Sequence, residues 1–119
     1  MLAIHVENLR DLTVIECKGR IVLSDAVFKL RNVVQAQDSP VIALDLSEVK
    51  AIGGGGLGML AYLERWTREN DIQLKLFCPS KPVLEGLAQN RSISNFDIAS
   101  FHEMMTVMGR SDSRYRAAA

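Results

Sequence analysis

The chain has 119 residues, which is enough for one domain with a single hydrophobic core. Its 14 basic and 14 acidic side chains cancel, so no net charge favours nucleic acid or an anionic membrane as a partner. No apolar run approaches the ~20 residues that span a bilayer, and neither a signal-peptide pattern nor a CxxC pair occurs, so we expect a cytoplasmic protein without direct membrane insertion.

The first half of the chain predicts three strands and one helix. Residues 2–6 and 12–18 carry strand-like alternation and β-branched residues, and the short link between them favours a hairpin. Ser24 is the expected N-cap of a helix over residues 24–37, where apolar residues recur at helical spacing. Residues 41–46 are almost continuously apolar, which is typical of a strand covered on both faces.

The second half continues the alternation of helices and strands. Helices are predicted over residues 57–69 and 82–89, and strands over residues 72–78 and 96–98. A capping box formed by Ser100 and Glu103 predicts one more helix, to about residue 108. We expect a domain over residues 1–109 and a flexible tail over residues 110–119. This order indicates an α/β domain with a mixed sheet of four or five strands and about four helices packed against it.

A run of four glycines, Gly53, Gly54, Gly55 and Gly56, separates the predicted strand over residues 41–46 from the helix over residues 57–69. Glycines allow positive φ angles and close backbone approaches that a Cβ atom forbids. No serine or threonine occurs from residue 48 to residue 66. Any function of this segment therefore depends on backbone and shape rather than on a hydroxyl group.

Candidate catalytic and metal-binding residues are few. His5 and His102 lie in different predicted elements, and neither has a Ser, Cys or Asp partner at a recognisable spacing. The possible carboxylate cluster comprises Asp45, Glu48, Glu64 and Glu69. We interpret these carboxylates as a strand-end residue and solvated helix charges, because nothing pairs them for acid–base chemistry. We expect no catalytic residue, no metal ligand and no cofactor.

The helix over residues 57–69 carries two apolar stripes. Leu57, Leu60 and Ala61 follow the spacing of a core-facing stripe. A second stripe consists of Met59, Tyr62 and Trp66. Trp66 is assigned to the core, whereas Met59 and Tyr62 fit the core and a protein-binding surface equally well.

Several segments together resemble the STAS domain, the domain of anti-sigma factor antagonists and sulphate transporter tails. They are residues 41–49 (VIALDLSEV), Ile52, residues 53–58 (GGGGLG) and residues 74–76 (LKL). Gly19, which follows the second predicted strand, also fits the pattern of the family. The resemblance covers roughly residues 2–108 and implies the same α/β fold with a single STAS-like domain.

In bacterial antagonists of this family, a hydroxyl residue at the start of the second helix is phosphorylated by the partner anti-sigma factor, a serine kinase. The family motif reads Asp-Ser-Ser/Thr-Gly-Leu-Gly. Its Asp aligns with Gly53, its phosphoacceptor with Gly54 and its second hydroxyl residue with Gly55, while residues 56–58 match. The resemblance therefore implies a degenerate phosphorylation motif and a protein that stays in the unphosphorylated, binding-competent form.

The resemblance also implies a binding surface for a serine-kinase anti-sigma factor or a related signalling protein. The expected partner-binding residues are Arg20, Ser24, Gly53, Gly54, Gly55, Gly56, Leu57, Met59 and Tyr62. We expect a non-enzymatic protein that is a monomer or a weak homodimer. Two alternatives stay open: a STAS scaffold or accessory subunit of a lipid transporter, and a sensor that binds a nucleotide at the glycine run. The glycine run fits neither a P-loop nor a Rossmann fingerprint in its usual context, which disfavours the sensor.

Overall fold

The structure, a computed structural model, describes residues 1–90 and 95–111. It contains five strands and four helices in these residues, as the sequence predicts. In chain order they are β1 (Leu2–Asn8), β2 (Leu12–Ile21), α1 (Ser24–Gln35), β3 (Val41–Ile52), α2 (Gly54–Glu69), β4 (Gln73–Phe77), α3 (Lys81–Gln89), β5 (Asp97–Ala99) and α4 (Phe101–Ser111).

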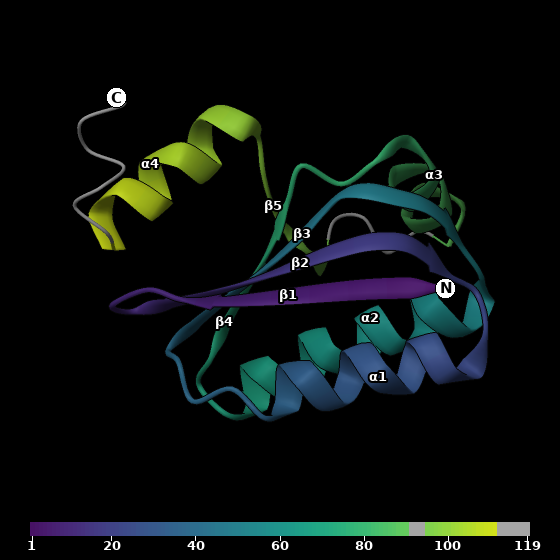
Figure 1. The fold of residues 1–119 in the computed structure, drawn as a ribbon, viewed down its shortest axis with the longest axis horizontal. Coiled ribbons are helices and arrows are strands. Elements are labelled where there is room, and N and C mark those ends of the chain that lie inside the picture. The colour runs from purple at the N-terminus through teal and green to yellow at the C-terminus, as the bar shows by residue number, and fades with distance from the viewer. Residues whose placement is uncertain (91–94, 112–119) are drawn as a thin grey trace.

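The five strands form one mixed sheet in the order β1-β2-β3-β4-β5 (Figure 1). β1 and β2 form the predicted antiparallel hairpin, which pairs Leu2 with Gly19 and Asn8 with Thr13. β3, β4 and β5 each run parallel to the preceding strand. The expected α/β fold with a mixed sheet is therefore confirmed.

The main hydrophobic core lies between the sheet and the pair of helices α1 and α2, which cover one face side by side (Figure 1). Both helices follow strands of the parallel part of the sheet, so their N-termini lie at the same end of the domain. The sheet and the helices contribute, among others, Ile15, Cys17, Ile42, Leu44, Ala26, Leu30, Leu60 and Leu63. Trp66 packs against this core, in agreement with the prediction.

A second, smaller core lies on the opposite face of the sheet, beneath α4 (Figure 1). Its buried members are Leu12, Val14, Ala43, Phe77, Ala99 and Met108. Phe77 alternates with Leu74 and Leu76 and so falls on the same face of its strand as the polar residues Gln73 and Lys75, a pattern that predicts a wetter face. Phe77 is nevertheless fully buried, because α4 covers that face. The predicted capping box is present at the start of α4, where Glu103 N–H donates to Ser100 Oγ at 3.2 Å.

Several predicted boundaries differ from the structure. β3 continues to Ile52, because its polar second half pairs with β2 through two register irregularities. Gly19 lies within β2 rather than after it, with a φ angle of +118° beside one of these irregularities. At the C-terminus, α4 continues to Ser111, two residues into the predicted tail, and the rest of that tail lies outside the described residues.

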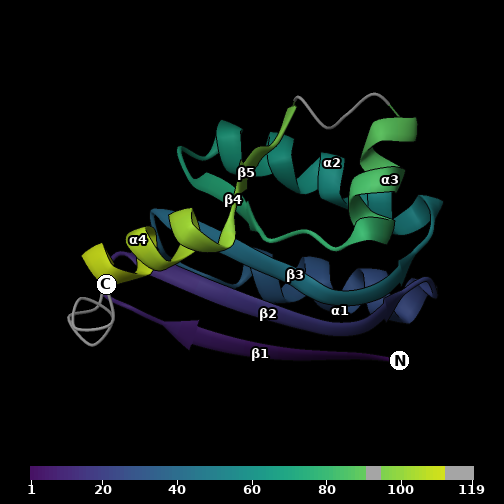
Figure 2. The same ribbon diagram turned by 90° about the horizontal axis from the view of Figure 1, so that it is seen from above.

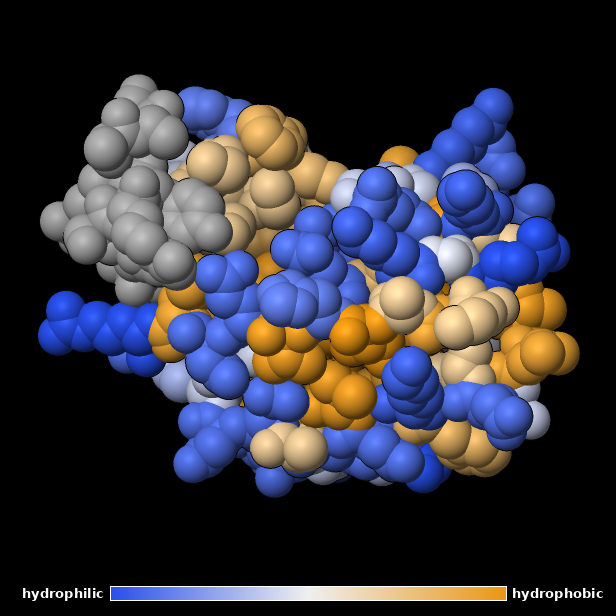
Figure 3. All heavy atoms as spheres, in the orientation of Figure 1, coloured by the Kyte–Doolittle hydropathy of each residue, from blue (hydrophilic) through white to orange (hydrophobic). Residues whose placement is uncertain are grey.

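The two long borders of the sheet differ in their surroundings. Viewed from above, β1 lies outermost along one border, and α1 is set back from it toward the middle of the sheet (Figure 2). At the other side, α3 packs beside the first turn of α2. An apolar area is visible on the surface where β1 runs above α1 (Figure 3). β1 is therefore an edge strand, and no described element lies beyond it in this view.

Candidate partner-binding site

The glycine run forms the N-cap and the first turn of α2. Gly53 is the N-cap, and α2 begins at Gly54 rather than at Leu57 as predicted. Gly53 N–H donates to the carbonyl oxygen of Ile21 at 3.0 Å, and Leu57 N–H donates to the carbonyl oxygen of Gly53 at 3.0 Å. The run is therefore part of the helix, and its first residue is fixed to the end of β2.

The conformational reason predicted for these glycines is wrong. Gly53 has φ −97° and ψ 178°, which is extended backbone that any residue adopts. Within the described part of the chain, the only glycine with a positive φ angle is Gly19. Residues 53–56 do not need glycine for their backbone angles.

A lack of space for a side chain explains only one of the four glycines, Gly56. A Cβ atom on Gly56 would lie 2.8 Å from Ile52 Cγ1 and 2.9 Å from both the Ile21 carbonyl oxygen and Ile21 Cγ2, so this position has no room for a side chain. A Cβ atom on Gly54 would meet no atom within 4 Å. Gly54 is exposed, and a side chain at this position would point into solvent.

The loop between β2 and α1 lies directly beside the first turn of α2. A Cβ atom on Gly53 would lie 3.8 Å from Val22 Cα, and one on Gly55 would lie 3.9 Å from Val27 Cγ2. The loop exposes two large apolar side chains, since Val22 is 44% and Leu23 is 70% exposed. Neither residue was among the predicted partner-binding residues, although two adjacent apolar residues in a predicted loop are a usable signal of an exposed apolar surface.

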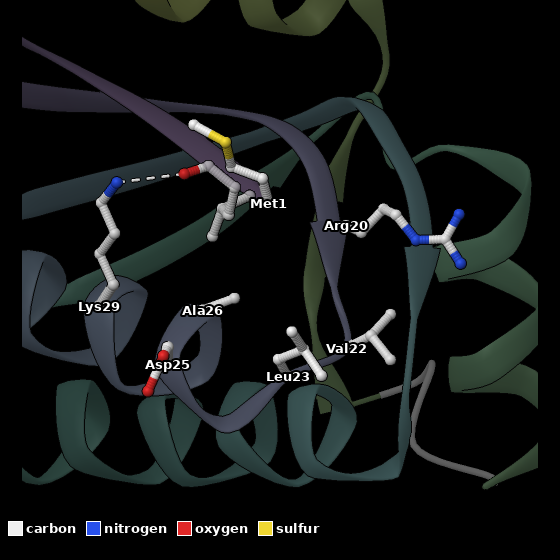
Figure 4. Close-up of a pocket in the computed structure, with 8 residues that line it drawn as sticks. Met1, Arg20, Val22, Leu23, Asp25, Ala26 and Lys29 are labelled. Atoms are coloured by element: carbon white, nitrogen blue, oxygen red, sulfur yellow. Dashed lines mark hydrogen bonds between the residues drawn. The ribbon is translucent and has the colours of Figure 1, made fainter.

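Arg20 and Ser24 flank this loop, as predicted. Both are exposed, but Ser24 is not the N-cap of α1, as we expected, because Leu23 occupies the N-cap position and Ser24 is already helical. No side chain caps α1. A cavity of about 530 Å³ opens beside the loop (Figure 4). It is lined by Met1, Leu2, Arg20, Val22, Leu23, Asp25, Ala26 and Lys29.

Three other predicted contact residues, all on α2, differ in how far they are exposed. Met59 is only 5% exposed and belongs to the main core. The side chain of Leu57 packs toward α3, where a Cβ atom on Gly86 would lie 3.0 Å from it. Tyr62 is 49% exposed, and its Oη accepts a hydrogen bond from Gln35 Nε2 at 3.1 Å. Of these three, Tyr62 is therefore the one with a large surface available to a partner.

The stripe assignment of α2 also needs a correction. Ala61, assigned to the core, is exposed, and the buried positions are Gly56, Met59, Leu60, Leu63 and Thr67. The core-facing stripe therefore includes Met59 beside Leu60, and Gly56 extends it at the start of the helix, where it sits against Ile21 and Ile52. In the first turn of α2, Gly56 is therefore on the buried side, and Gly54 and Gly55 are on the exposed side.

The possible acid–base groups are engaged in local interactions or lie apart. Asp45 accepts hydrogen bonds from Ser47 N–H at 3.0 Å and from Ser47 Oγ at 2.7 Å. Glu48 lies 3.2 Å from Lys18 Nζ in an exposed ion pair. The thiol of Cys17 is buried, and this burial, with the charges of Asp45 and Glu16, raises its pKa to about 12, so it stays protonated.

Clusters of ligating groups and long apolar helices are both absent from residues 1–90 and 95–111. No three His, Cys, Asp or Glu side chains in these ranges gather as a metal site would require. None of the helices in the same ranges combines the length and the apolar character needed to cross a bilayer.

Comparison with known proteins gives a family and a fold. The STAS domain family matches residues 3–107. The structure is similar to that of the anti-sigma factor antagonist SpoIIAA in its unphosphorylated form, with a TM-score of 0.70 and 18% identity over 91% of this chain and 95% of the other. No curated protein matches the sequence.

Two further solved structures share the fold at similarly low identity. An anti-sigma factor antagonist from Mycobacterium paratuberculosis has a TM-score of 0.68 and 20% identity, over 82% of this chain and 85% of the other. A putative anti-sigma factor antagonist from Thermotoga maritima has a TM-score of 0.72 and 14% identity, over 87% of this chain and 92% of the other. At these identities the similarity concerns the fold.

Proposed function

Because this chain belongs to the STAS domain family, we propose that it is a non-enzymatic, cytoplasmic regulator of the anti-sigma factor antagonist type. In this proposal it binds a serine-kinase anti-sigma factor and has lost the residue that would carry the regulatory phosphate. The similarity of its fold to solved anti-sigma factor antagonists supports the class of partner.

The exposed, side-chain-free start of α2 carries the proposal. Gly54 is the first residue of the helix, at the position that the STAS resemblance assigns to the phosphoacceptor. A side chain here would reach solvent without touching any neighbour. The fold leaves room for a serine at this position, so packing does not explain why the residue is a glycine.

The absence of a hydroxyl group at residue 54 removes an electrostatic switch. A phosphate would add about 1.5–2 negative charges and three acceptor oxygens at the N-terminus of α2, on the surface that meets the partner. Glycine cannot be phosphorylated, and the exposed groups beside it are the apolar side chains of Val22 and Leu23. In the proposed function, the partner therefore always meets an uncharged, partly apolar surface around Gly54.

This surface has the composition of a protein-binding site. It combines the exposed backbone of Gly54 and Gly55 with the apolar side chains of Val22 and Leu23 and the cation of Arg20. Exposed apolar groups beside an arginine are enriched where proteins bind one another. Since the Gly53–Ile21 hydrogen bond ties the two segments together, they would present one pre-formed surface.

The proposal is tested with purified candidate serine-kinase anti-sigma factors and Mg-ATP. The wild-type chain should bind one of them with the same affinity in ADP and in ATP, and mass spectrometry should find no phosphate on it. Gly54→Ser should bind equally well in ADP, but should take up phosphate and dissociate in ATP. Gly54→Ala adds bulk without a hydroxyl group, so it should behave like the wild type.

Two results would contradict the proposal. Phosphate on the wild-type chain, at any residue of the surface defined by Arg20, Ser24 and residues 53–62, would mean that the switch is not lost. Failure of every kinase-type anti-sigma factor to bind, together with recovery of a transporter ATPase in a pull-down, would favour the scaffold alternative.

A further inference from the structure

The outer border of β1 has no neighbouring strand among residues 1–90 and 95–111. β1 is the terminal strand of the sheet, and no described element lies beyond it (Figure 2). Proteins protect such edges with lysine, proline or bulges in the strand. β1 contains none of these residues, and its register with β2 is unbroken over all seven of its residues.

The hydrogen bonds at the start of β1 show which backbone groups point outward. The Met1 carbonyl oxygen accepts the Arg20 N–H at 3.2 Å, so it points toward β2. The Leu2 carbonyl oxygen instead accepts a hydrogen bond from Lys29 Nζ at 3.1 Å (Figure 4). Because the direction alternates along an antiparallel strand, the outward N–H and C=O groups belong to the even-numbered residues. These residues are Leu2, Ile4, Val6 and Asn8.

The side chains of β1 divide between the two faces of the sheet. Leu2, Ile4 and Val6 face the helix layer and pack against the main core, but Ile4 and Val6 are only half-buried. Figure 3 shows an apolar area on this face of the molecule. Ala3 and His5 are exposed on the opposite face. A strand added beside β1 would therefore bury apolar surface on the helix side.

We propose that this edge binds a second copy of the chain, with β1 pairing antiparallel to β1 of the second copy about a two-fold axis at His5. This register places Leu2 opposite Asn8 and Ile4 opposite Val6, so it uses all the outward backbone groups of the strand. It joins the two five-stranded sheets and keeps the helices of both copies on one face. The contact is isologous and closed, as expected for a homodimer.

The side chains are complementary to each other in this register. Ile4 of each copy lies opposite Val6 of the other, so the apolar side chains form one continuous row across the two-fold axis. On the other face, each Glu7 lies diagonal to His5 of the second copy, so a carboxylate approaches an imidazole on both sides of the axis. In the single chain, Lys29 Nζ donates a hydrogen bond to the outward carbonyl oxygen of Leu2. In the dimer, the Asn8 N–H of the second copy donates to this oxygen instead.

Cysteine cross-linking tests the register. His5 and its counterpart form a pair without mutual hydrogen bonds, with Cα atoms about 4.5 Å apart, which is within the range of a disulfide. His5→Cys should therefore form a covalent dimer rapidly under mild oxidation. Ala3→Cys is the matched control: its two cysteines would be four residues out of register, roughly 13 Å apart. Wild-type protein, oxidised in parallel, accounts for Cys17 and Cys78.

Charge exchange at the same position gives an independent readout. His5→Glu should weaken association about tenfold in sedimentation experiments, because four carboxylates would then meet around the axis. His5→Lys alone places two ammonium groups face to face, so it should also associate less than the wild type. An equal mixture of the two variants should associate at least as strongly as the wild type. His5 is exposed, so circular dichroism should show all three proteins equally folded.

The outcomes are decisive in both directions. A cross-link at position 5 but not at position 3, with recovery in the mixture, supports the proposal. Equal rates of cross-linking at both positions, or a wild-type dimer that is insensitive to His5→Glu, would assign the contact to another surface. A wild-type chain that stays monomeric at all concentrations would overturn the proposal, and none of these results depends on the anti-sigma factor.

Discussion

The two sides of the first turn of α2 have the same residue type for different reasons. On the inner side, Gly56 lies so close to Ile52 and Ile21 that even one carbon atom would overlap them. On the outer side, Gly54 and Gly58 face open space. Packing therefore requires glycine at residue 56, whereas neither packing nor backbone angles require it at residues 54 and 58.

This difference shows how a single run of identical residues can combine structure and function. An exposed glycine in a helix costs about 0.5–1 kcal/mol relative to alanine, because the unfolded chain loses more freedom on folding. At Gly54 the structure offers no compensation for this cost. The absence of a side chain there is accounted for in the proposed function, in which residue 54 no longer carries a phosphate.

The largest expected effect comes from the inner side of the turn. Gly56→Ala should lower the free energy of unfolding by about 1–2 kcal/mol, since overpacking costs more than alanine gains in helix propensity. The new methyl group would press on the carbonyl oxygen of Ile21, which also holds the Gly53 N–H. Urea unfolding measures the change, and an unaltered midpoint would mean that the inner side is not tightly packed.

An acidic side chain on the outer side should separate stability from binding. Gly54→Asp places a carboxylate at the N-terminus of α2, which should stabilise the fold by about 0.3–1 kcal/mol. The same charge imitates part of a phosphate and should weaken the binding of an anti-sigma factor about tenfold, measured by calorimetry. Gly54→Asn, of the same size but uncharged, should retain affinity. Equal losses in both variants would point to steric rather than electrostatic exclusion.

A neutral substitution on the outer side isolates the cost of glycine itself. Gly58 is exposed, and a Cβ atom there meets nothing within 4 Å. Gly58→Ala should therefore raise the free energy of unfolding by about 0.5–1 kcal/mol in the same urea experiment. A loss of stability would show that the space around α2 is narrower than the structure indicates.

The smallest effect is expected one turn further along α2. Tyr62→Phe removes the hydroxyl group that accepts the Gln35 hydrogen bond at the surface. Both ends of that bond can be solvated, so the free energy of unfolding should change by less than about 0.5 kcal/mol. Thermal unfolding of the variant and the wild type in parallel checks this expectation, and a large loss would identify Tyr62 as a structural residue.

Periodicity was sufficient to predict the order of the strands and helices. The alternation of Leu74 and Leu76 and the continuous apolar segment before Asp45 correspond to strands because both patterns depend on local spacing. Phe77 could not be placed in this way. Its burial depends on α4, which follows more than 20 residues later and covers a face that the strand pattern leaves wet.

The candidate site was predictable in position but not in detail. The STAS resemblance indicated the start of α2 and the loop around Arg20 and Ser24, which the structure brings together through the Gly53–Ile21 hydrogen bond. Two details could not be predicted: which glycine packs against the sheet, and that Met59 is buried. Both depend on where α2 begins and on which of its sides faces the sheet. A glycine run provides no side-chain pattern from which either could be read.

The small core beneath α4 is separate from the main core, so we expect α4 to unfold locally at a lower free energy than the rest of the sheet. α4 is attached through Met104, Val107 and Met108, and over residues 101–109 none of its residues belongs to the main core on the other side of the sheet. Amide protons in α4 should therefore exchange with deuterium faster than those in β2 and β3. A transient detachment of α4 would uncover Phe77 while leaving the start of α2, where the proposed binding surface lies, intact.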